Sequence, residues 1–177
     1  MDSLCSHPIK SWRRRLFACA VLLLTSTLKA EQFPPTEGQN LLGKPVSLPA
    51  AAAGQPAILV LGFTHASQNQ TKAWSQRLEK QFPPPAPVWI YSIAVLQDVP
   101  KLVRGMAVHG IRSGVPAEQH ARFVLVYRKE AELKQAAGFT APDDAYIVVL
   151  DPAGAIRWRF HGPVTDSAID QLLAQLK

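Results

Sequence analysis

The chain has 177 residues, which is enough for a single domain with a substantial buried core. Its hydrophobic content of 47% and charged content of 18% are those of an ordinary globular protein and exclude a disordered or fibrous one. The formal net charge is +6, but five basic side chains and one acid precede residue 31. The remaining 14 basic and 12 acidic side chains leave a net charge of +2, so the composition does not favour nucleic-acid binding.

The first 30 residues have the pattern of a targeting signal. A basic stretch, Trp12–Arg15, precedes an apolar run over Leu16–Leu24, and Leu28–Ala30 is an imperfect cleavage site. The run is shorter than the roughly 20 apolar residues that a membrane-spanning helix needs. We therefore expect a signal peptide over residues 1–30 and a secreted protein that is periplasmic or otherwise extracytoplasmic. An uncleaved N-terminal membrane anchor is the alternative, and no lipid anchor is expected.

Both cysteines of the chain, Cys5 and Cys19, lie within this leader. The mature chain would therefore contain no thiol and no disulfide. Thiol–disulfide exchange and peroxide reduction by a thiolate both need a sulfur, so we exclude a dithiol oxidoreductase and a thiol peroxidase. Copper or zinc binding through cysteine is excluded for the same reason.

Behind the leader, residues 31–56 form a proline-rich lead-in. A short edge hairpin is expected over Asn40–Pro49, because an edge position tolerates proline. The main domain is expected over residues 57–177. It begins with a continuous apolar strand over Ala57–Phe63, the pattern of a strand covered on both faces.

A helix is predicted next, over Ser67–Phe82. Trp74 and Leu78 recur at a spacing of four residues and define its inward face. Ser67 is the predicted N-cap, and Gln70 stands at the position of its capping-box partner.

The second half of the chain continues the alternation of strands and helices. A helix over Lys101–Gly110 is expected to turn Leu102, Val103 and Met106 inward. Thr165 is the predicted cap of the last helix. The other predicted elements are strands at Val88–Leu96, Phe123–Tyr127, Tyr146–Leu150 and Ala155–His161, a turn at Asp151–Gly154, and helices at Lys129–Ala137 and Asp166–Leu176.

The order β-α-β-α-β-α-β-β-α predicts an α/β fold, with a mixed sheet and helices on both faces. A βαβ half followed by a ββα half is the plan of the thioredoxin-like superfamily, which the chain resembles over Gln39–Lys177. The segment Val149–Arg157 is similar to the strand–turn–strand of redoxins and TlpA-like proteins. The resemblance implies a cis-proline just before the strand at Tyr146, but Asp143, Asp144 and Ala145 stand there instead.

Two narrower resemblances differ in what they imply. Leu61–His65 resembles the SCO/SenC copper chaperones, in which a cysteine pair follows, but here Ala66 and Gln70 take those positions. Copper binding is therefore not implied. Tyr146–Asp151, together with Ile156–Trp158, resembles the mitochondrial ATP-synthase assembly-factor family of thioredoxin-like proteins. That family assembles the membrane sector of ATP synthase and does not depend on a CxxC motif. The secretory leader favours a bacterial relative.

The candidate site residues gather at two places in the sequence. His65, Ser67 and Gln70 occupy the strand–helix turn where redoxins keep their cysteines, and Arg157 and Arg159 alternate along a strand with Trp158 on its other face. The arginines are interpreted either as solvated or as the flank of a partner-binding surface. No catalytic residue, metal ligand set or cofactor is predicted, because the histidines have no metal-ligand spacing.

Three functional hypotheses follow. The first is a non-catalytic, extracytoplasmic binding or assembly-factor module whose partner is a protein, such as a subunit of a membrane complex. The second is an enzyme that uses the same cleft without cysteine, through His65, Ser67 or Gln70. The third is a metal (copper) chaperone with a site built from His65, His120 or His161. The missing sulfurs and the family resemblance favour the first.

Overall fold

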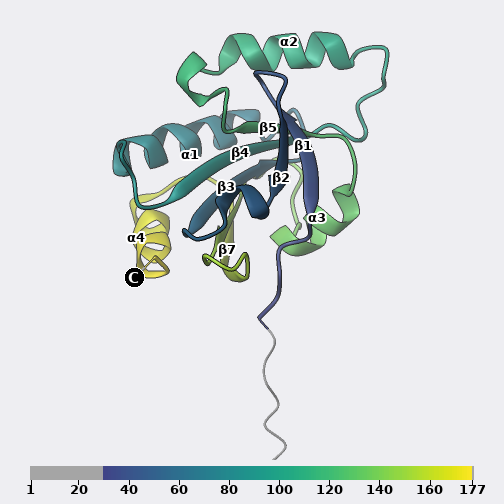
Figure 1. Cartoon of the computed structure of the whole chain (residues 1–177). Coiled ribbons are helices and arrows are strands. Elements are labelled where there is room, and N and C mark those ends of the chain that lie inside the picture. Colours follow the sequence, from purple (N-terminus) through teal and green to yellow (C-terminus); the bar gives the residue numbers. More distant parts are fainter. Residues whose placement is uncertain (1–29, 177) are drawn as a thin grey trace, which may run out of the picture.

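A computed structural model describes residues 30–176, in which seven strands form one mixed sheet (Figure 1). The predicted leader over residues 1–30 therefore lies almost wholly outside the described part. The strands are β1 (Thr36–Asn40), β2 (Pro45–Leu48), β3 (Ala57–Gly62), β4 (Trp89–Val95), β5 (Phe123–Val126), β6 (Tyr146–Leu150) and β7 (Ile156–His161). The helices are α1 (Gln68–Gln81), α2 (Arg104–Gly114), α3 (Glu130–Ala137) and α4 (Asp166–Ala174), with short 3₁₀ turns η1 (Ala50–Ala52) and η2 (Ala117–Gln119).

The strand order is β2-β1-β5-β4-β3-β6-β7. β4 runs parallel to β3 and to β5, whereas β6 pairs antiparallel with both β3 and β7. This mixed sheet confirms the predicted α/β fold class. The expected edge hairpin is also present as β1 and β2, and β1 pairs with β5, so the lead-in supplies two strands of the same sheet.

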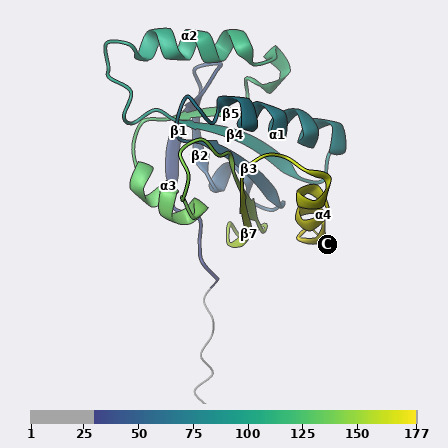
Figure 2. The same cartoon turned by 180° about the vertical axis from the view of Figure 1, so that it is seen from behind.

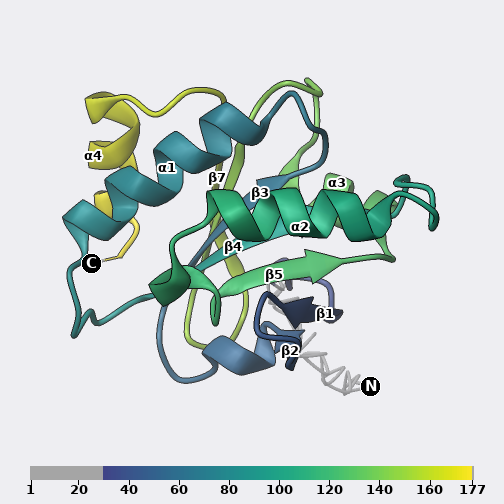
Figure 3. The same cartoon turned by 90° about the horizontal axis from the view of Figure 1, so that it is seen from above.

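Alternation along β3 explains why helices cover both faces. Ile58 and Val60 belong to an apolar cluster with residues of α1 and α4, and Leu59 and Leu61 belong to a second cluster with residues of α3. The views from behind and from above show α1, α2 and α4 over one face and α3 over the other (Figures 2 and 3). The predicted inward residue Trp74 is fully buried in the first cluster.

Several helices and turns have the predicted capping or turn residue at their ends. Gly138 closes α3 in the left-handed conformation, and the Thr165 hydroxyl accepts the Ala168 amide at 3.1 Å as the cap of α4. Gly154 has a φ of +81°, and a Cβ there would lie 2.7 Å from Pro49. The β6–β7 turn therefore requires glycine at that position.

Helix α2 differs from the prediction. It begins at Arg104, three residues later than expected, and Leu102 and Met106 are exposed by 95% and 76%. The inward side chains are Val108 and Ile111, which pack on a small cluster. Met106 lies two residues before Val108, and a separation of about 200° around the helix places it on the opposite side. No helix within residues 30–176 is long and apolar enough to span a membrane.

Candidate functional site

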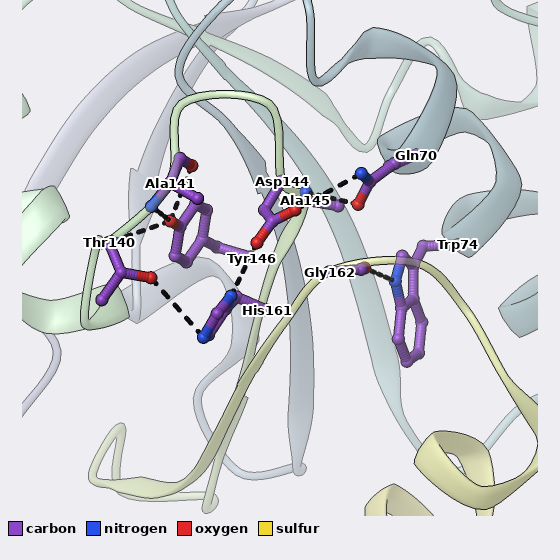
Figure 4. Close-up of polar contacts among 9 residues, drawn as sticks. All are labelled: Gln70, Trp74, Thr140, Ala141, Asp144, Ala145, Tyr146, His161 and Gly162. Atoms are coloured by element: carbon purple, nitrogen blue, oxygen red, sulfur yellow. Dashed lines mark hydrogen bonds and ion pairs between the residues drawn. The ribbon is translucent and has the colours of Figure 1, made fainter.

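The candidate site lies where the carboxyl end of β3 and the start of α1 meet the loop that enters β6 (Figure 4). Leu61 pairs with Tyr146 at this end of the sheet. Tyr146 pairs in turn with His161, the last residue of β7. The register therefore brings the strand–helix turn, the loop 138–145 and the end of β7 together, although they are far apart in the sequence.

Gln70 holds the loop against α1 with both ends of its side-chain amide. Its oxygen accepts the backbone N–H of Ala145 at 3.2 Å, and its nitrogen donates to a carboxylate oxygen of Asp144 at 3.4 Å. The hydroxyl of Thr64 adds a third bridge, because it donates to the carbonyl of Pro142 at 2.6 Å. We call these three contacts the clamp. Of these residues, Gln70 stands at a position where the redoxin resemblance implies a cysteine.

Ser67 is the N-cap residue of α1, as predicted, but the predicted capping box with Gln70 does not form. The Ser67 side chain makes no cap bond, and its hydroxyl donates instead to the Thr64 carbonyl at 2.9 Å. Ser67 is also fully buried, so it is not a group that a partner or substrate can reach. Gln70 is used in the clamp because the loop before β6 offers a buried amide that needs an acceptor.

Tyr146 anchors the same loop from inside the core. Its hydroxyl accepts the amides of Thr140 at 2.9 Å and Ala141 at 2.7 Å, and donates to the Ala141 carbonyl at 2.8 Å. The ring is fully buried and lies against Phe63 and Phe139, with centroids 5.5 and 5.3 Å away. The phenol therefore satisfies three backbone groups of the turn at once.

His161 and Asp144 form an imidazole–carboxylate pair at the site. Nδ1 of the histidine lies 2.7 Å from an Asp144 carboxylate oxygen, and Nε2 lies 3.5 Å from the Thr140 hydroxyl. The imidazole stacks on Tyr146, with centroids 5.6 Å apart, and its side chain is 48% exposed. Sequence reasoning missed this pair because 17 residues separate its members, and only the β6–β7 register brings them together. The one sequence signal for His161 is the alternation along β7, which puts it on the same side of the strand as Arg159.

Trp74 ties α1 to the end of β7. Its indole N–H donates to the Gly162 carbonyl at 2.9 Å, and its ring packs edge-on against Phe160. This buried bond fixes the chain where it leaves β7 for α4. The position of His161, one residue earlier, is thereby fixed as well.

The predicted arginines project from β7 into solvent, and each has an acidic partner. Arg157 lies at a β-bulge, with its guanidinium 3.8 Å from Asp151. Arg159 pairs with Glu31 and donates to the carbonyl of Ala136 on α3 at 2.6 Å. Trp158, between them, is half-buried and packs on the apolar cluster of α1 and α4. The two arginines are thus on the surface but not next to Gln70.

The histidines of the third hypothesis lie in three different settings. His65 is exposed in the turn before α1, His120 contacts the Val115 carbonyl at 2.9 Å, and His161 contacts Asp144. Residues 30–176 contain no group of three His, Cys, Asp or Glu side chains that could hold a metal ion.

A small hollow of about 180 Å³ lies at the other end of the sheet. It is lined by η1 and the β6–β7 turn, next to Leu150, which pairs with Ala57 at the start of β3. The clamp is at the opposite end of β3, so the hollow is not part of the candidate site.

Two described groups have shifted pKa values, and both lie away from the clamp. Burial and the nearby Glu118 raise the pKa of Glu79 above its ordinary value, while Arg122 and a hydrogen bond from Gln119 lower it in part. Burial raises the pKa of Tyr91, again opposed by Arg122.

Similar solved structures show the same fold. The exposed lipoprotein thioredoxin of Streptococcus pneumoniae has a TM-score of 0.59 at 13% identity and covers 80% of this chain and 99% of its own. The thioredoxin domain of a thiol-disulfide oxidoreductase from Bacteroides vulgatus has a TM-score of 0.58 at 16% identity, covering 84% and 97%. BsSco, of the Sco family of cytochrome c oxidase assembly proteins, has a TM-score of 0.51 at 15% identity, covering 84% and 95%.

These identities show the fold alone, and they confirm the predicted thioredoxin-like architecture. No curated protein matches the chain. A family model described as ATP10 protein matches residues 16–177, which is most of the chain. The predicted resemblance to ATP-synthase assembly factors is thereby confirmed, and the chain belongs to the ATP10 family of such factors.

Proposed function

We propose that the protein is a non-catalytic assembly factor that acts outside the cytoplasm by binding a protein subunit of a membrane complex. Membership of the ATP10 family supports the assembly role. The observation that carries the non-catalytic part is the use of Gln70. Its amide is bonded at both ends to Asp144 and Ala145, so a position that bears a cysteine in redoxins here holds the loop in place.

The chemistry of the mature chain supports the same conclusion. No cysteine follows Cys19, so residues 20–177 cannot exchange disulfides. A hydrogen-bonded clamp also keeps the loop 138–145 in one conformation. A fixed loop is well suited to present a surface to a partner, because little conformational entropy is lost when the partner binds.

The proposed binding surface starts at the clamp and continues along the exposed side of β7. His65 projects from the turn before α1, and His161, Arg159 and Arg157 follow along β7. The Arg157 side chain is 60% exposed and its contact with Asp151 is long, so its charge is open to an acidic partner. Arginine and histidine at such a rim provide charge-assisted hydrogen bonds to carboxylates.

A crosslinking capture from membrane fractions of the source organism tests this surface. We expect the wild-type chain to capture a membrane-complex subunit, and Arg157→Ala with Arg159→Ala to lower capture about tenfold or more. Arg77→Ala is the matched control, because Arg77 is another surface arginine paired with a carboxylate, Asp166, at 3.3 Å. Equal loss in the control, or no capture by the wild type, would contradict the proposal.

Arg159 also contacts Ala136 and Glu31, so thermal melting of each variant is a necessary check. Arg157→Ala alone is a second variant, since Arg157 makes the looser contact. A loss of capture by this variant with an unchanged melting temperature would assign the effect to the surface and not to folding.

The location outside the cytoplasm rests on the basic and apolar pattern of residues 12–24. Fusion of the full chain to alkaline phosphatase, which is active only after export, tests it. We expect an active fusion, and replacement of the three consecutive arginines Arg13, Arg14 and Arg15 by glutamate should abolish activity. An inactive wild-type fusion of normal abundance would place the protein in the cytoplasm.

One observation favours a second candidate function, an enzyme that works without cysteine. Asp144, His161 and Thr140 are ordered as acid, imidazole and hydroxyl, which is the logic of an activated nucleophile. The hydroxyl is 3.5 Å from Nε2, however, and the amides of Thr140 and Ala141 are both bonded to Tyr146. These two amides are thus not free to stabilise an oxyanion. Loss of assembly in His161→Gln with capture unchanged would favour this candidate.

A further inference from the structure

The start of α2 and the turn before it expose apolar side chains that the sheet does not cover. Leu102, Val103 and Met106 are 95%, 40% and 76% exposed. Within residues 30–176, Leu42 is the other large hydrophobic residue that is exposed, so three of four lie within five consecutive positions. Single exposed hydrophobics are ordinary on a protein surface, but a group of them indicates a contact surface. We call this group the apolar tip.

The apolar tip is strongly exposed, with Leu102 at 95% and Met106 at 76%. The inner side chains of α2, Val108 and Ile111, already pack on Leu41, Leu96 and Leu125. Figure 1 shows α2 on the outside of the molecule, at the far end from residue 30.

The segment of the chain that includes the apolar tip carries an excess of positive charge. Residues 97–129 contain six basic and two acidic side chains, whereas the rest of residues 30–176 contains seven basic and ten acidic ones. Lys101 and Arg128 are exposed, and neither takes part in an ion pair within the described chain. The molecule is therefore polarised, with its positive side at α2.

Arg104 is held beside the apolar tip. Its guanidinium lies 5.1 Å from the centroid of the Tyr127 ring and donates to the carbonyls of Val99 at 2.8 Å and Gln97 at 3.2 Å. These partners carry no charge, so the charge of Arg104 is not neutralised by them. Arg128 directly follows Tyr127 in the sequence.

We propose that the apolar tip of α2 docks on the surface of a bilayer that contains anionic lipids. Leu102 and Met106 would enter the headgroup region, and Lys101, Arg104 and Arg128 would contact lipid phosphates. Protruding apolar side chains flanked by cations fit a bilayer, which deforms around them and is negatively charged at its surface. A protein partner would need a preformed pocket of matching shape for the same protrusion.

The test must separate α2 from the leader, because residues 16–24 are apolar and can bind a membrane themselves. We would use the full chain with Cys5→Ser and Cys19→Ser, and attach an environment-sensitive fluorophore at Met106→Cys. The matched control carries the same label at Ala153→Cys, an exposed position in the β6–β7 turn. The vesicles contain phosphatidylcholine alone, or phosphatidylcholine with about one-third phosphatidylglycerol.

The fluorescence emission of the label at position 106 should shift to shorter wavelength when anionic vesicles are added. The shift should be smaller on neutral vesicles and smaller at high salt. The label at position 153 should not respond. Each cation removed should weaken vesicle binding about fivefold. Lys101→Gln with Arg128→Gln should therefore weaken it on the order of thirtyfold. The control, Lys44→Gln with Lys72→Gln, should leave it unchanged. Leu102→Ser should weaken it about tenfold or more.

Three outcomes would overturn the proposal. The first is vesicle binding of the full chain with no response at position 106, which would assign membrane binding to the leader. The second is an equal response on neutral and anionic vesicles. The third is a response at position 106 to solubilised membrane proteins but not to vesicles, which would assign the apolar tip to a protein partner. Vesicle binding does not depend on subunit capture, so the proposed assembly function is tested separately.

Discussion

The most connected single residue of the candidate site is Tyr146. Its hydroxyl forms hydrogen bonds with two amides and one carbonyl of residues 140–141, and its ring is fully buried. The aromatic rings of Phe63 and Phe139 hold the phenol in position. This hydroxyl group therefore attaches the loop to the core in addition to the clamp.

We predict that Tyr146→Phe lowers the free energy of unfolding by about 1–3 kcal/mol, because it leaves backbone groups of the loop without a partner. Urea titration followed by tryptophan fluorescence measures this change. Tyr127→Phe is the control, since the hydroxyl of that half-buried tyrosine makes no hydrogen bond within the described chain, and it should cost less than about 0.5 kcal/mol. Equal stability of the two variants would contradict the role of the phenol.

Glu79 gives a pH-dependent prediction at the same scale. Burial and Glu118 raise its pKa above the ordinary 4.5, so ionisation of Glu79 disfavours the folded state. Its effect on stability is most favourable below that ordinary value and is lost as pH rises through the folded pKa. Glu79→Gln, which keeps an oxygen for the bond from Gln119, should therefore stabilise the fold by less than about 1 kcal/mol at pH 7.

The melting temperatures of wild type and Glu79→Gln, measured from pH 3 to pH 8, check this sign. The two curves should coincide at the acidic end and separate as the pH rises. A variant that is less stable than wild type at pH 7 would show that the ionised carboxylate, with Arg122 and Gln119, is a net favourable contact.

At the scale of elements, α2 is packed less firmly than the other helices. None of its residues is buried, whereas α1, α3 and α4 each bury at least three. Its inner face contacts only the small cluster of Leu41, Leu96 and Leu125. We therefore expect α2 to open more readily than the rest of the domain.

Paired substitutions measure this difference. Leu133→Ala, in the fully buried inner face of α3, should cost about 2–5 kcal/mol, and Ile111→Ala, in the half-buried face of α2, should cost about 1 kcal/mol or less. Hydrogen exchange should likewise be faster in residues 104–114 than in residues 130–137. Equal costs and equal protection would mean that α2 is as well anchored as α3.

Elements with an extensive buried apolar face were predicted correctly from the spacing of their apolar residues. The continuous run of β3 and the spacing of Trp74 and Leu78 arise because both segments are buried, so strand and helix were predicted at the correct positions. The prediction was wrong for α2, where two apolar stripes compete. Met106 and Val108 are equally apolar in the sequence, and only the position of the sheet decides which one faces inward.

At the scale of the whole molecule, the candidate site is assembled by register. His65 and Gln70 were predicted from the strand–helix turn alone, because redoxins place their cysteines there. The pair of Asp144 and His161 was not predicted, since it depends on the pairing of Tyr146 with both Leu61 and His161. Sequence patterns report local contacts, whereas these residues come together only through the pairing of β3, β6 and β7.

The overall distribution of charge and chemistry gives two separate surfaces. The clamp lies at the carboxyl end of β3, and the exposed groups of β7 continue from it along that strand. The positively charged segment includes α2. A factor that assembles a membrane complex can use the first for a protein subunit and the second for the bilayer. The central claim is that the first surface binds a partner without thiol chemistry.

Site-specific photo-crosslinking tests that claim most directly. A benzophenone side chain placed at His65, in the full chain with Cys5→Ser and Cys19→Ser, reports what lies against the clamp in intact membranes. The account predicts a covalent adduct with a membrane-complex subunit, undiminished by loss of both cysteines, and no such adduct from the control position Ala174, an exposed residue of α4. An adduct that disappears without the cysteines, or that forms equally from Ala174, would contradict the account.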